Sequence, residues 1–483
     1  MSPEVPPKLC SVPSSDSSAT YITRLMVGMK NSLHALKAKP SNEQLESWAV
    51  LIHESMSRSS RNYHSIQHVF DIAQDETDPI LVLSAFFHDC IYYHVDGGFS
   101  KYQASILKDV VDIEELGEHH LTISTDDTLL NMVECIFGFQ PGQAVGPNSG
   151  LNEFLSAIVA VRKLEPVLSK DDLAQIACCI EATIPFRSTN DETPSTMDML
   201  HERMVKANCE FELGMSDDIL VKAVKRAVRT SHLDLANFAT TDRAFFLDNA
   251  WSLLPETNES LRKNQYLYTV QEFQTAVYNL YGFFSFLKPT VVFMSFRGFP
   301  EPQELAVMTT EATRNINVAR RYVKAKLLSM SVLTAFAVLT GGDAAMALLI
   351  GDLFSRQDDS RCLQDVLPTP PPERVENGCD IDAYNILLKG RNQETSFDIR
   401  QSPVSAYLYG WMGDDTVDKV LKDRQVCPMD ADNAKDLLAH MPRNLVQRVG
   451  TVLAEVAVSR SDAICAVIQD LPETSCSQDL SGA

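Results

Sequence analysis

Histidine is concentrated in one short part of the chain, where its spacing could support metal binding or acid–base chemistry. Five of the eleven histidines lie within residues 53–94. In the middle of this stretch the chain reads RNYHSIQHVFDI, so that His64 and His68 are four residues apart. On a helix, side chains at this spacing share one face, while Ile66 and Phe70 lie on the opposite side and can pack against neighbouring helices. The spacing therefore predicts two imidazoles that address one pocket.

A second pair of side chains that can bind metal, His88-Asp89, follows a strongly apolar run at residues 80–87. The run predicts a buried helix, which places both side chains at the end of an apolar element. A lone buried carboxylate is costly unless a cation neutralises it, and a divalent ion flanked by imidazoles supplies that charge. The position of Asp89 therefore favours metal binding.

These residues resemble the HD superfamily of metal-dependent phosphohydrolases, whose signature is a histidine, then a His-Asp pair, then a distant aspartate. Two branches share the pattern found here. Small bacterial HD phosphohydrolases carry R-x-Y-H-x-x-x-H and a following F-H-D, and the cyclic-nucleotide phosphodiesterases are similar across the same elements. The matching residues are Arg61, Tyr63, His64, His68 and Phe87-His88-Asp89.

The distant aspartate of the signature also has a counterpart. The segment Asp234-Leu235-Ala236-Asn237 resembles the D-L-[SA]-N sequence that holds the last metal ligand of those phosphodiesterases. Residues 219–231, directly before it, have helical spacing, which predicts that Asp234 lies near a helix end. The resemblance covers about residues 42–253.

The resemblance implies a centre for one or two divalent ions, and zinc, manganese, iron, cobalt and magnesium all stay open. It implies that His64 and Asp89 are catalytic, with His64 as the general acid that protonates the leaving group, since an imidazole can donate a proton near neutral pH. The expected reaction is hydrolysis of a small phosphoester by water that the metal activates, with a nucleotide or cyclic nucleotide as the best substrate class. The implied metal ligands are His68, His88, Asp89, which could bridge two ions, and Asp234.

Three basic residues are candidates for contact with the substrate phosphate: Arg61, Lys101 and Arg187. Arg187 ends the segment EATIPFR, which falls where related proteins have an A-T motif followed by a histidine, and no histidine follows here. For Arg61 and Lys101 a surface ion pair is the competing interpretation.

Two other functional classes stay open. Some HD proteins are dinuclear iron oxygenases that use two further histidines between the His-Asp pair and the last aspartate. His119 or His120 could supply one of them, but residues 180–187 contain no histidine to supply the other. The remaining alternative is a degenerate HD domain that serves as a binding or regulatory module.

The rest of the sequence predicts the elements that must position these residues. Apolar residues recur three and four apart over residues 21–36, 45–56 and 80–93, which predicts helices. Strand-like alternation is scarce, although residues 289–295 could form a short strand. We therefore predict an all-α fold, in which an HD-type helical domain is followed by a second helical region.

Composition along the chain predicts the domain limits. Residues 1–20 are rich in Pro and Ser, which predicts a flexible tail. We expect residues 21–300 to form the phosphohydrolase domain and residues 301–483 to form a structural or regulatory helical region. Within that region, residues 368–378 (PTPPPERVENG) predict a proline-rich linker. The C-terminal helices could pair with another subunit, giving a homo-oligomer, or receive a partner protein.

Charge and cysteine usage predict the surroundings in which the protein works. The net charge of −22 disfavours nucleic acid as a partner, because it repels a phosphate backbone. The eleven cysteines form no CxxC pair, which is typical of reduced thiols and predicts a cytoplasmic protein. The sixteen uncharged residues 327–342 are short for a membrane span, so we expect a buried helix there and no membrane association.

Overall fold

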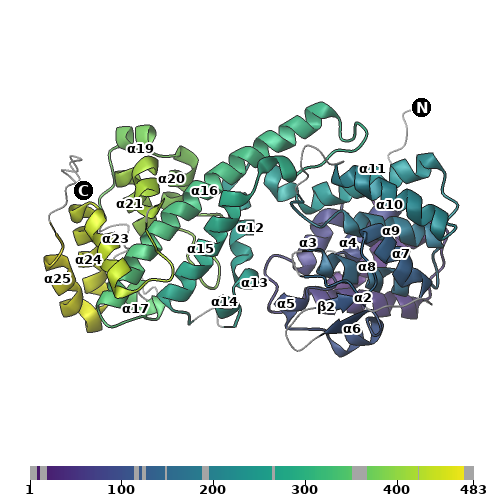
Figure 1. Cartoon of the computed structure of the whole chain (residues 1–483), viewed down its shortest axis with the longest axis horizontal. Coiled ribbons are helices and arrows are strands. Elements are labelled where there is room, and N and C mark those ends of the chain that lie inside the picture. The colour runs from purple at the N-terminus through teal and green to yellow at the C-terminus, as the bar shows by residue number, and fades with distance from the viewer. Residues whose placement is uncertain are drawn as a thin grey trace. The chain divides into compact units, whose positions relative to one another are not determined.

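The chain folds as an all-α protein, which confirms the predicted fold class (Figure 1). The one sheet among the described residues is a short antiparallel hairpin of β1 (Val111–Ile113) and β2 (His119–Leu121), in which Asp112 pairs with His120. The computed structural model describes residues 8–10, 19–113, 119–121, 127–146, 149–187, 195–263, 267–350, 367–422 and 424–472.

The helices form two compact units, and each unit contains two separate stretches of the chain. Unit 1 comprises residues 1–239 and 288–310, and unit 2 comprises residues 240–287 and 311–483. This division differs from the predicted break at residue 300, because residues 240–287 belong with the C-terminal region and the last boundary falls within the long helix that starts at Pro302. The limits of the units are therefore set by packing between distant segments.

Unit 1 contains all of the predicted site residues. Its helices and 3-10 turns are α1 (Tyr21–Ala35), α2 (Asn42–Met56), α3 (Ile66–Ala73), α4 (Pro79–Phe87), α5 (Tyr93–Asp96), α6 (Lys101–Ile106), α7 (Thr128–Phe137), α8 (Leu151–Leu164), α9 (Lys170–Glu181), α10 (Thr196–Glu210), α11 (Asp217–Asp234), η2 (Ala236–Ala239) and η3 (Pro289–Val291).

Helix α4 is the centre of unit 1 and packs against α1, α3, α8, α9 and α11. Its sequence is apolar on every side, so that residues 80–87 are all buried. The Asp78 carboxylate caps its first amides and Pro79 occupies the first helical position, which fixes where it begins. It ends at residue 87, so the helix predicted over 80–93 is too long and the chain turns at His88-Asp89.

Two further local predictions in unit 1 differ from the structure. The predicted tail lies partly outside the described residues, but Leu9 and Cys10 within it are buried in the core, and the Leu9 amide donates to the carbonyl of Glu76 at 3.2 Å. Residues 289–295 contain the 3-10 turn η3 instead of a strand, because Pro289 has no amide to donate to a sheet.

Unit 2 is also helical, and most of α16 belongs to it. Its elements are α12 (Arg243–Ser252), α13 (Leu254–Thr257), α14 (Glu259–Lys263), α15 (Val270–Phe286), α16 (Pro302–Leu339), α17 (Met346–Ile350), α19 (Pro372–Gly378), α20 (Ile381–Lys389), α21 (Pro403–Met412), α22 (Asp414–Lys422), α23 (Ala431–His440), α24 (Arg443–Val456), η4 (Val458–Arg460) and α25 (Ser461–Gln469).

The most apolar segment of the chain lies in α16. By length and composition this helix could cross a membrane, but 89% of its most apolar window is buried within the protein. The prediction of a buried helix over residues 327–342 therefore holds as far as Leu339, where α16 ends.

The predicted proline-rich linker is partly wrong. Residues 372–378 form helix α19, with Pro371 at its N-cap and Pro372 at its first helical position. Proline is tolerated there because the first amides of a helix have no partner within the helix. Only residues 368–371 keep the extended character that the sequence predicted.

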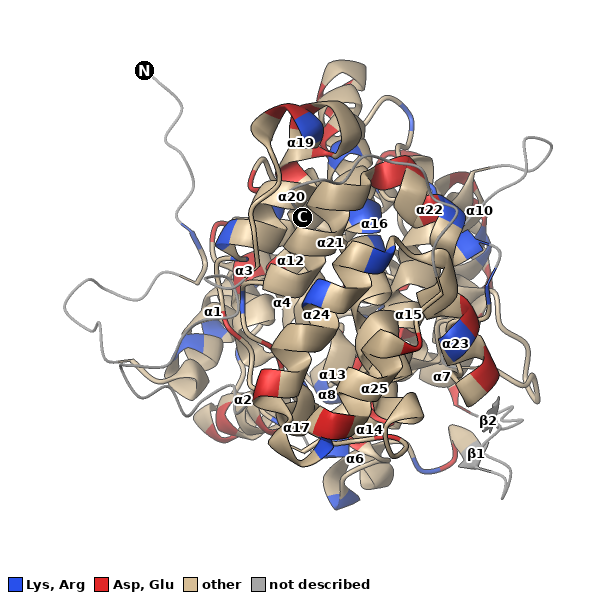
Figure 2. Cartoon of the chain, turned by 90° about the vertical axis from the view of Figure 1, so that its left-hand side faces the viewer, with Lys and Arg blue, Asp and Glu red and all other residues tan. Residues whose placement is uncertain are grey.

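A buried ionic network joins α12 and α16 to the segment before α21. Along helices such as α19, α22 and α23 of this unit, acidic and basic positions are interspersed (Figure 2). In the buried network, one carboxylate oxygen of Asp398 accepts from Trp251 Nε1 at 3.0 Å, Lys326 Nζ at 2.8 Å and Arg391 Nη1 at 3.3 Å. Asp398 thus pairs with two buried cations, Lys326 and Arg391.

Candidate metal centre

Three segments of unit 1 bring the four predicted ligands together. His68 lies in the first turn of α3, His88 caps the C-terminus of α4 with Asp89 next to it, and Asp234 is the last residue of α11. Because α3, α4 and α11 pack against one another, three helix ends meet at this point. Packing of these helices brings side chains that are far apart in the sequence close together in space.

The ligand atoms lie close enough to share one cation. One atom each from His68, His88 and Asp234 fall within 4.8 Å of one another. His68 Nε2 is 2.9 Å from Asp234 Oδ1, and His88 Nε2 is 3.6 Å from the same oxygen. Asp89 Oδ2 is 3.0 Å from His88 Nε2 and 3.9 Å from His68 Nε2.

The donor atoms also have the chemistry that a metal site requires. His88 is 2% exposed, and its Nδ1 lies 2.9 Å from the carbonyl oxygen of Ala85. A hydrogen bond from Nδ1–H to that carbonyl leaves the lone pair on Nε2 free to bind a cation. His88 Nε2 and Asp89 Oδ2 are buried and lie 3.0 Å apart, and neither makes a hydrogen bond of regular geometry with the described residues, so a divalent cation beside them fits the residues present.

The electrostatics of the cluster favour positive charge at its centre. Burial opposes ionisation of Asp234, but its hydrogen bonds with His68 and His88 and the charges of both rings lower its pKa to about 2. The pKa of Asp89 is lowered despite burial, chiefly by His88. The pKa of His88 is raised despite burial, mainly by Asp89. The carboxylates are thus set to stay ionised and to stabilise a cation among the imidazoles.

His64 lies beside the cluster, although not on a helix as the spacing predicted. Helix α3 begins at Ile66, and Ser65 is its N-cap. The His64 ring is nevertheless centred 6.0 Å from that of His68, at 87° to it. Its charge helps to lower the pKa of Asp89, which places it within electrostatic reach of the predicted ligands.

Arg61 occupies a different position from the predicted phosphate contact. Its side chain is fully buried, and two of its nitrogens bind the two oxygens of Asp96 at 2.9 and 2.7 Å. Its Nη1 donates to the backbone carbonyl of Asp89 at 2.6 Å. The guanidinium is therefore held inside the protein, where it fixes the backbone of a predicted ligand.

The other two candidates for a phosphate contact, Arg187 and Lys101, make no contact with the predicted ligands in the described part of the chain. Arg187 Nη1 lies 2.6 Å from the buried carboxylate of Glu181, which also binds Arg203, so that an internal ion pair engages it. Lys101 is exposed in the first turn of α6, and no hydrogen bond or ion pair links it to a predicted ligand in the described part of the chain. The side chains of His119 and His120 lie outside what the structure describes.

A carboxylate that the motifs did not indicate, Glu153 of α8, lies within electrostatic reach of the cluster. It interacts electrostatically with Asp89, Asp234 and His88, and burial followed by the two aspartates raises its pKa to about 7. Its Oε2 is buried, and no hydrogen bond to it is found among the residues that the structure describes. No spacing rule pointed to it, because it lies 64 residues beyond Asp89 in a separate helix.

His232, two residues before Asp234, anchors the end of α11. Its Nε2 lies 2.8 Å from the carbonyl oxygen of Met294, and its ring meets Phe293 edge to face. Burial lowers its pKa to about 4, so the ring is neutral at physiological pH. This position accords with a structural role.

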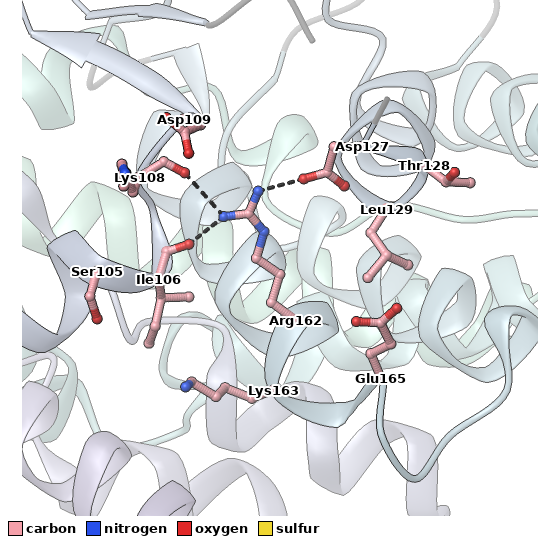
Figure 3. A pocket seen from close by; sticks show the side chains of 10 residues that line it. All are labelled: Ser105, Ile106, Lys108, Asp109, Asp127, Thr128, Leu129, Arg162, Lys163 and Glu165. Carbon is pink, nitrogen blue, oxygen red and sulfur yellow. Dashed lines mark hydrogen bonds and ion pairs between the residues drawn. The ribbon is translucent and has the colours of Figure 1, made fainter. Parts of the chain in front are cut away.

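A surface hollow lies elsewhere in unit 1, and none of the predicted site residues lines it (Figure 3). Its volume is about 860 Å³. Arg162 at its centre is engaged by the carbonyls of Ile106 and Lys108 and by Asp127. This hollow is therefore separate from the His-Asp cluster, and its central cation is already bound by the protein.

Comparison with protein-family models, with curated proteins and with solved structures finds no match for the chain.

Proposed function

We propose that this protein is a metal-dependent phosphohydrolase whose centre is formed by His68, His88, Asp89 and Asp234. The observation that carries the proposal is the meeting of two imidazoles and two carboxylates, in which His88 Nε2 and Asp89 Oδ2 are buried 3.0 Å apart without a regular hydrogen bond to the described residues. Such a donor set suits zinc, manganese, iron or cobalt. A nucleotide or cyclic nucleotide is the best substrate class.

The residues around the cluster divide the work of phosphoester cleavage. A bound divalent cation would lower the pKa of water and polarise a phosphoryl oxygen. His64, beside His68, is placed to donate a proton to the departing alkoxide. Asp89 balances the positive charge, and Arg61 holds the Asp89 backbone in place. Tyr63 and Tyr92 stand edge-on to the His64 ring and restrict its orientation.

The decisive test is metal content measured by mass spectrometry beside a screen of phosphomonoesters, phosphodiesters and nucleotides with added Mn²⁺. Asp89→Ala should lose the metal and the turnover together, because a ligand is removed. His64→Ala should keep the metal while kcat falls by about 10²- to 10⁴-fold, which is the usual contribution of a general acid.

The matched control is His440→Ala, which removes an exposed imidazole of unit 2 and should change neither quantity. Unchanged rates in His64→Ala would show that His64 is not the acid. Bound iron without any hydrolysis would support an oxygenase, and a protein without metal or turnover would support a degenerate module.

A further inference from the structure

Residues 89–92 connect α4 to α5 and carry both the predicted ligand Asp89 and the aromatic ring of Tyr92. We call them the α4–α5 link. Backbone groups outside helices and strands need other hydrogen-bond partners when the chain is buried. Along this link and at the first residue of α5, four side chains from other parts of unit 1 supply such partners.

Two carbonyls of the α4–α5 link accept from long side chains. Arg61 Nη1 donates to the Asp89 carbonyl at 2.6 Å, and Gln103 Nε2 donates to the Cys90 carbonyl at 2.9 Å. Gln103 is itself held, because its Oε1 accepts from the Ser100 amide at 2.8 Å. The start of the link is therefore fixed by Arg61 and by α6.

The amides on either side of Tyr92 are bound by α8. The Ile91 amide donates to Ser156 Oγ at 3.0 Å, and the Tyr93 amide donates to Asn152 Oδ1 at 3.1 Å. Asn152 and Ser156 are both buried, and because they are four residues apart they share one face of the helix. Helix α8 therefore fixes the backbone directly before and directly after Tyr92.

The ring of Tyr92 contacts the proposed general acid. Its centre lies 4.8 Å from that of His64, and the two planes meet at 88°. The guanidinium carbon of Arg61 lies 5.7 Å from the centre of the same Tyr92 ring. Aromatic rings favour this edge-to-face arrangement, so a displacement of the Tyr92 backbone would also displace His64.

We propose that Asn152 and Ser156 are positioning residues that hold His64 in place through the backbone on either side of Tyr92. This inference rests on the proposed function, in which His64 donates the proton, and it names the helix that determines where the acid stands. A general acid must lie within hydrogen-bond reach of the departing oxygen, so its position determines the rate.

The activity test compares two esters on the full chain loaded with Mn²⁺. Cyclic AMP releases an alkoxide, which needs a proton as it leaves, whereas bis(p-nitrophenyl) phosphate releases a nitrophenolate, which does not. Ser156→Ala and Asn152→Leu should each lower kcat for cyclic AMP by about 10- to 100-fold, because a displacement of about 1 Å can cost that much. The kcat for the nitrophenyl ester and the metal content should stay close to those of the wild type.

The matched control is Ser331→Ala, which removes a buried helical serine of unit 2 that accepts from Gln274 Nε2 at 2.9 Å. It should match the wild type with both esters. In the background of His64→Ala, Ser156→Ala should cause no further loss of kcat for cyclic AMP, because the acid that it positions is already absent.

The contact between the two rings can be measured without turnover. In a chain labelled only on Tyr and His, a nuclear Overhauser effect should join Tyr92 to His64, and its loss in Tyr92→Leu assigns it. The signal should be lost in Ser156→Ala and Asn152→Leu. It should persist in Ser331→Ala and in Asn152→Asp, which keeps the acceptor oxygen.

An unchanged ring contact in both Ser156→Ala and Asn152→Leu would overturn the inference. Equal losses of kcat for the two esters would also overturn it, because a merely structural role would lower both. If the wild type hydrolyses neither these esters nor any other in the screen, the proposed function fails, and the ring contact alone then decides whether Asn152 and Ser156 position His64.

Discussion

Arg61 belongs to the motif that suggested the function, but in the folded chain its side chain forms a buried ion pair with Asp96. Its position before Tyr63-His64 suggested a phosphate contact, but the folded chain buries it against Asp96 and the Asp89 carbonyl. A guanidinium can satisfy a carboxylate and a carbonyl at the same time because its donors are fixed in one plane. At the scale of residues, the buried guanidinium of Arg61 links Asp96 to the backbone of the predicted ligand Asp89.

Arg61→Met should destabilise the protein and weaken its metal site. Removing one partner of a buried pair leaves Asp96 poorly compensated, so we expect a loss of about 3–5 kcal/mol in the free energy of unfolding. Metal affinity should fall by about 10- to 100-fold, because the backbone of Asp89 is released. Urea unfolding and competition with a chelator measure the two effects.

The control for this variant is Lys101→Met, an exposed position whose unfolding free energy should change by no more than about 0.5 kcal/mol. A raised KM in Arg61→Met with unchanged stability would instead mean that Arg61 contacts the substrate.

Among the elements, helix ends form the centre and helix interiors support it. The predicted ligands lie at the start of α3 and at the ends of α4 and α11.

Helix α7 contains a buried carboxylate, since Glu134 within it is 3% exposed and its Oε1 has no hydrogen-bond partner among the described residues. Burial, and then Asp127, raises the pKa of Glu134 to about 7.

Glu134 should make the protein less stable as pH rises. Its folded pKa of about 7 is above the ordinary value of 4.5, so between these values the folded state holds more protons than the unfolded state. Stability is therefore lost from about pH 4.5 to pH 7, by up to about 3 kcal/mol. Glu134→Gln should remove this loss and raise the Tm at pH 8, as scanning calorimetry across this range can measure.

Glu210→Gln, at an exposed position of α10, is the matched control and should leave the pH profile of stability unchanged. An identical profile in Glu134→Gln and wild type would mean that Glu134 remains ionised in the folded protein.

At the scale of the whole molecule, the chain crosses between its two units, and segment 240–287 belongs with the C-terminal region. Helix α15 in this segment is held within unit 2, because Gln274 donates to Ser331 Oγ at 2.9 Å and to the Val426 carbonyl at 2.7 Å. Phe273 and Phe284 of α15 are buried there too. The two units therefore cannot be separated by a single cut.

A chain that ends at residue 300 should aggregate, because the buried face of α15 would lose the surfaces that cover it. A chain in which residues 1–239 are joined to residues 288–310 by a short flexible linker should instead be monomeric and bind metal. Size-exclusion chromatography, binding of a hydrophobic dye and Mn²⁺ content distinguish the two proteins. The division into units would be wrong if the chain cut at residue 300 were monomeric and bound no dye while the joined chain aggregated.

The sequence by itself determined the helical class and the identity of four candidate ligands. Helical periodicity and capping are local properties, so α1 and α2 could be predicted with bounds close to those observed. A short motif such as His88-Asp89 can be recognised as a candidate metal-binding pair from the sequence alone, because its donor atoms do not depend on the fold. The long-range match to Asp234 came from a resemblance of motifs, and the structure brings that residue to 2.9 Å from His68.

Only the tertiary structure decided which further residues lie near the four candidate ligands. Glu153 is brought to the centre by the packing of α8, whereas Arg61 and Arg187 are withdrawn into ion pairs with Asp96 and Glu181. The assignment of segment 240–287 to unit 2 likewise depends on contacts with α16 and the chain beyond it. The physical reason is common to these cases: whether a charged side chain faces a site, a partner or solvent depends on neighbours distant in sequence, which local spacing does not encode.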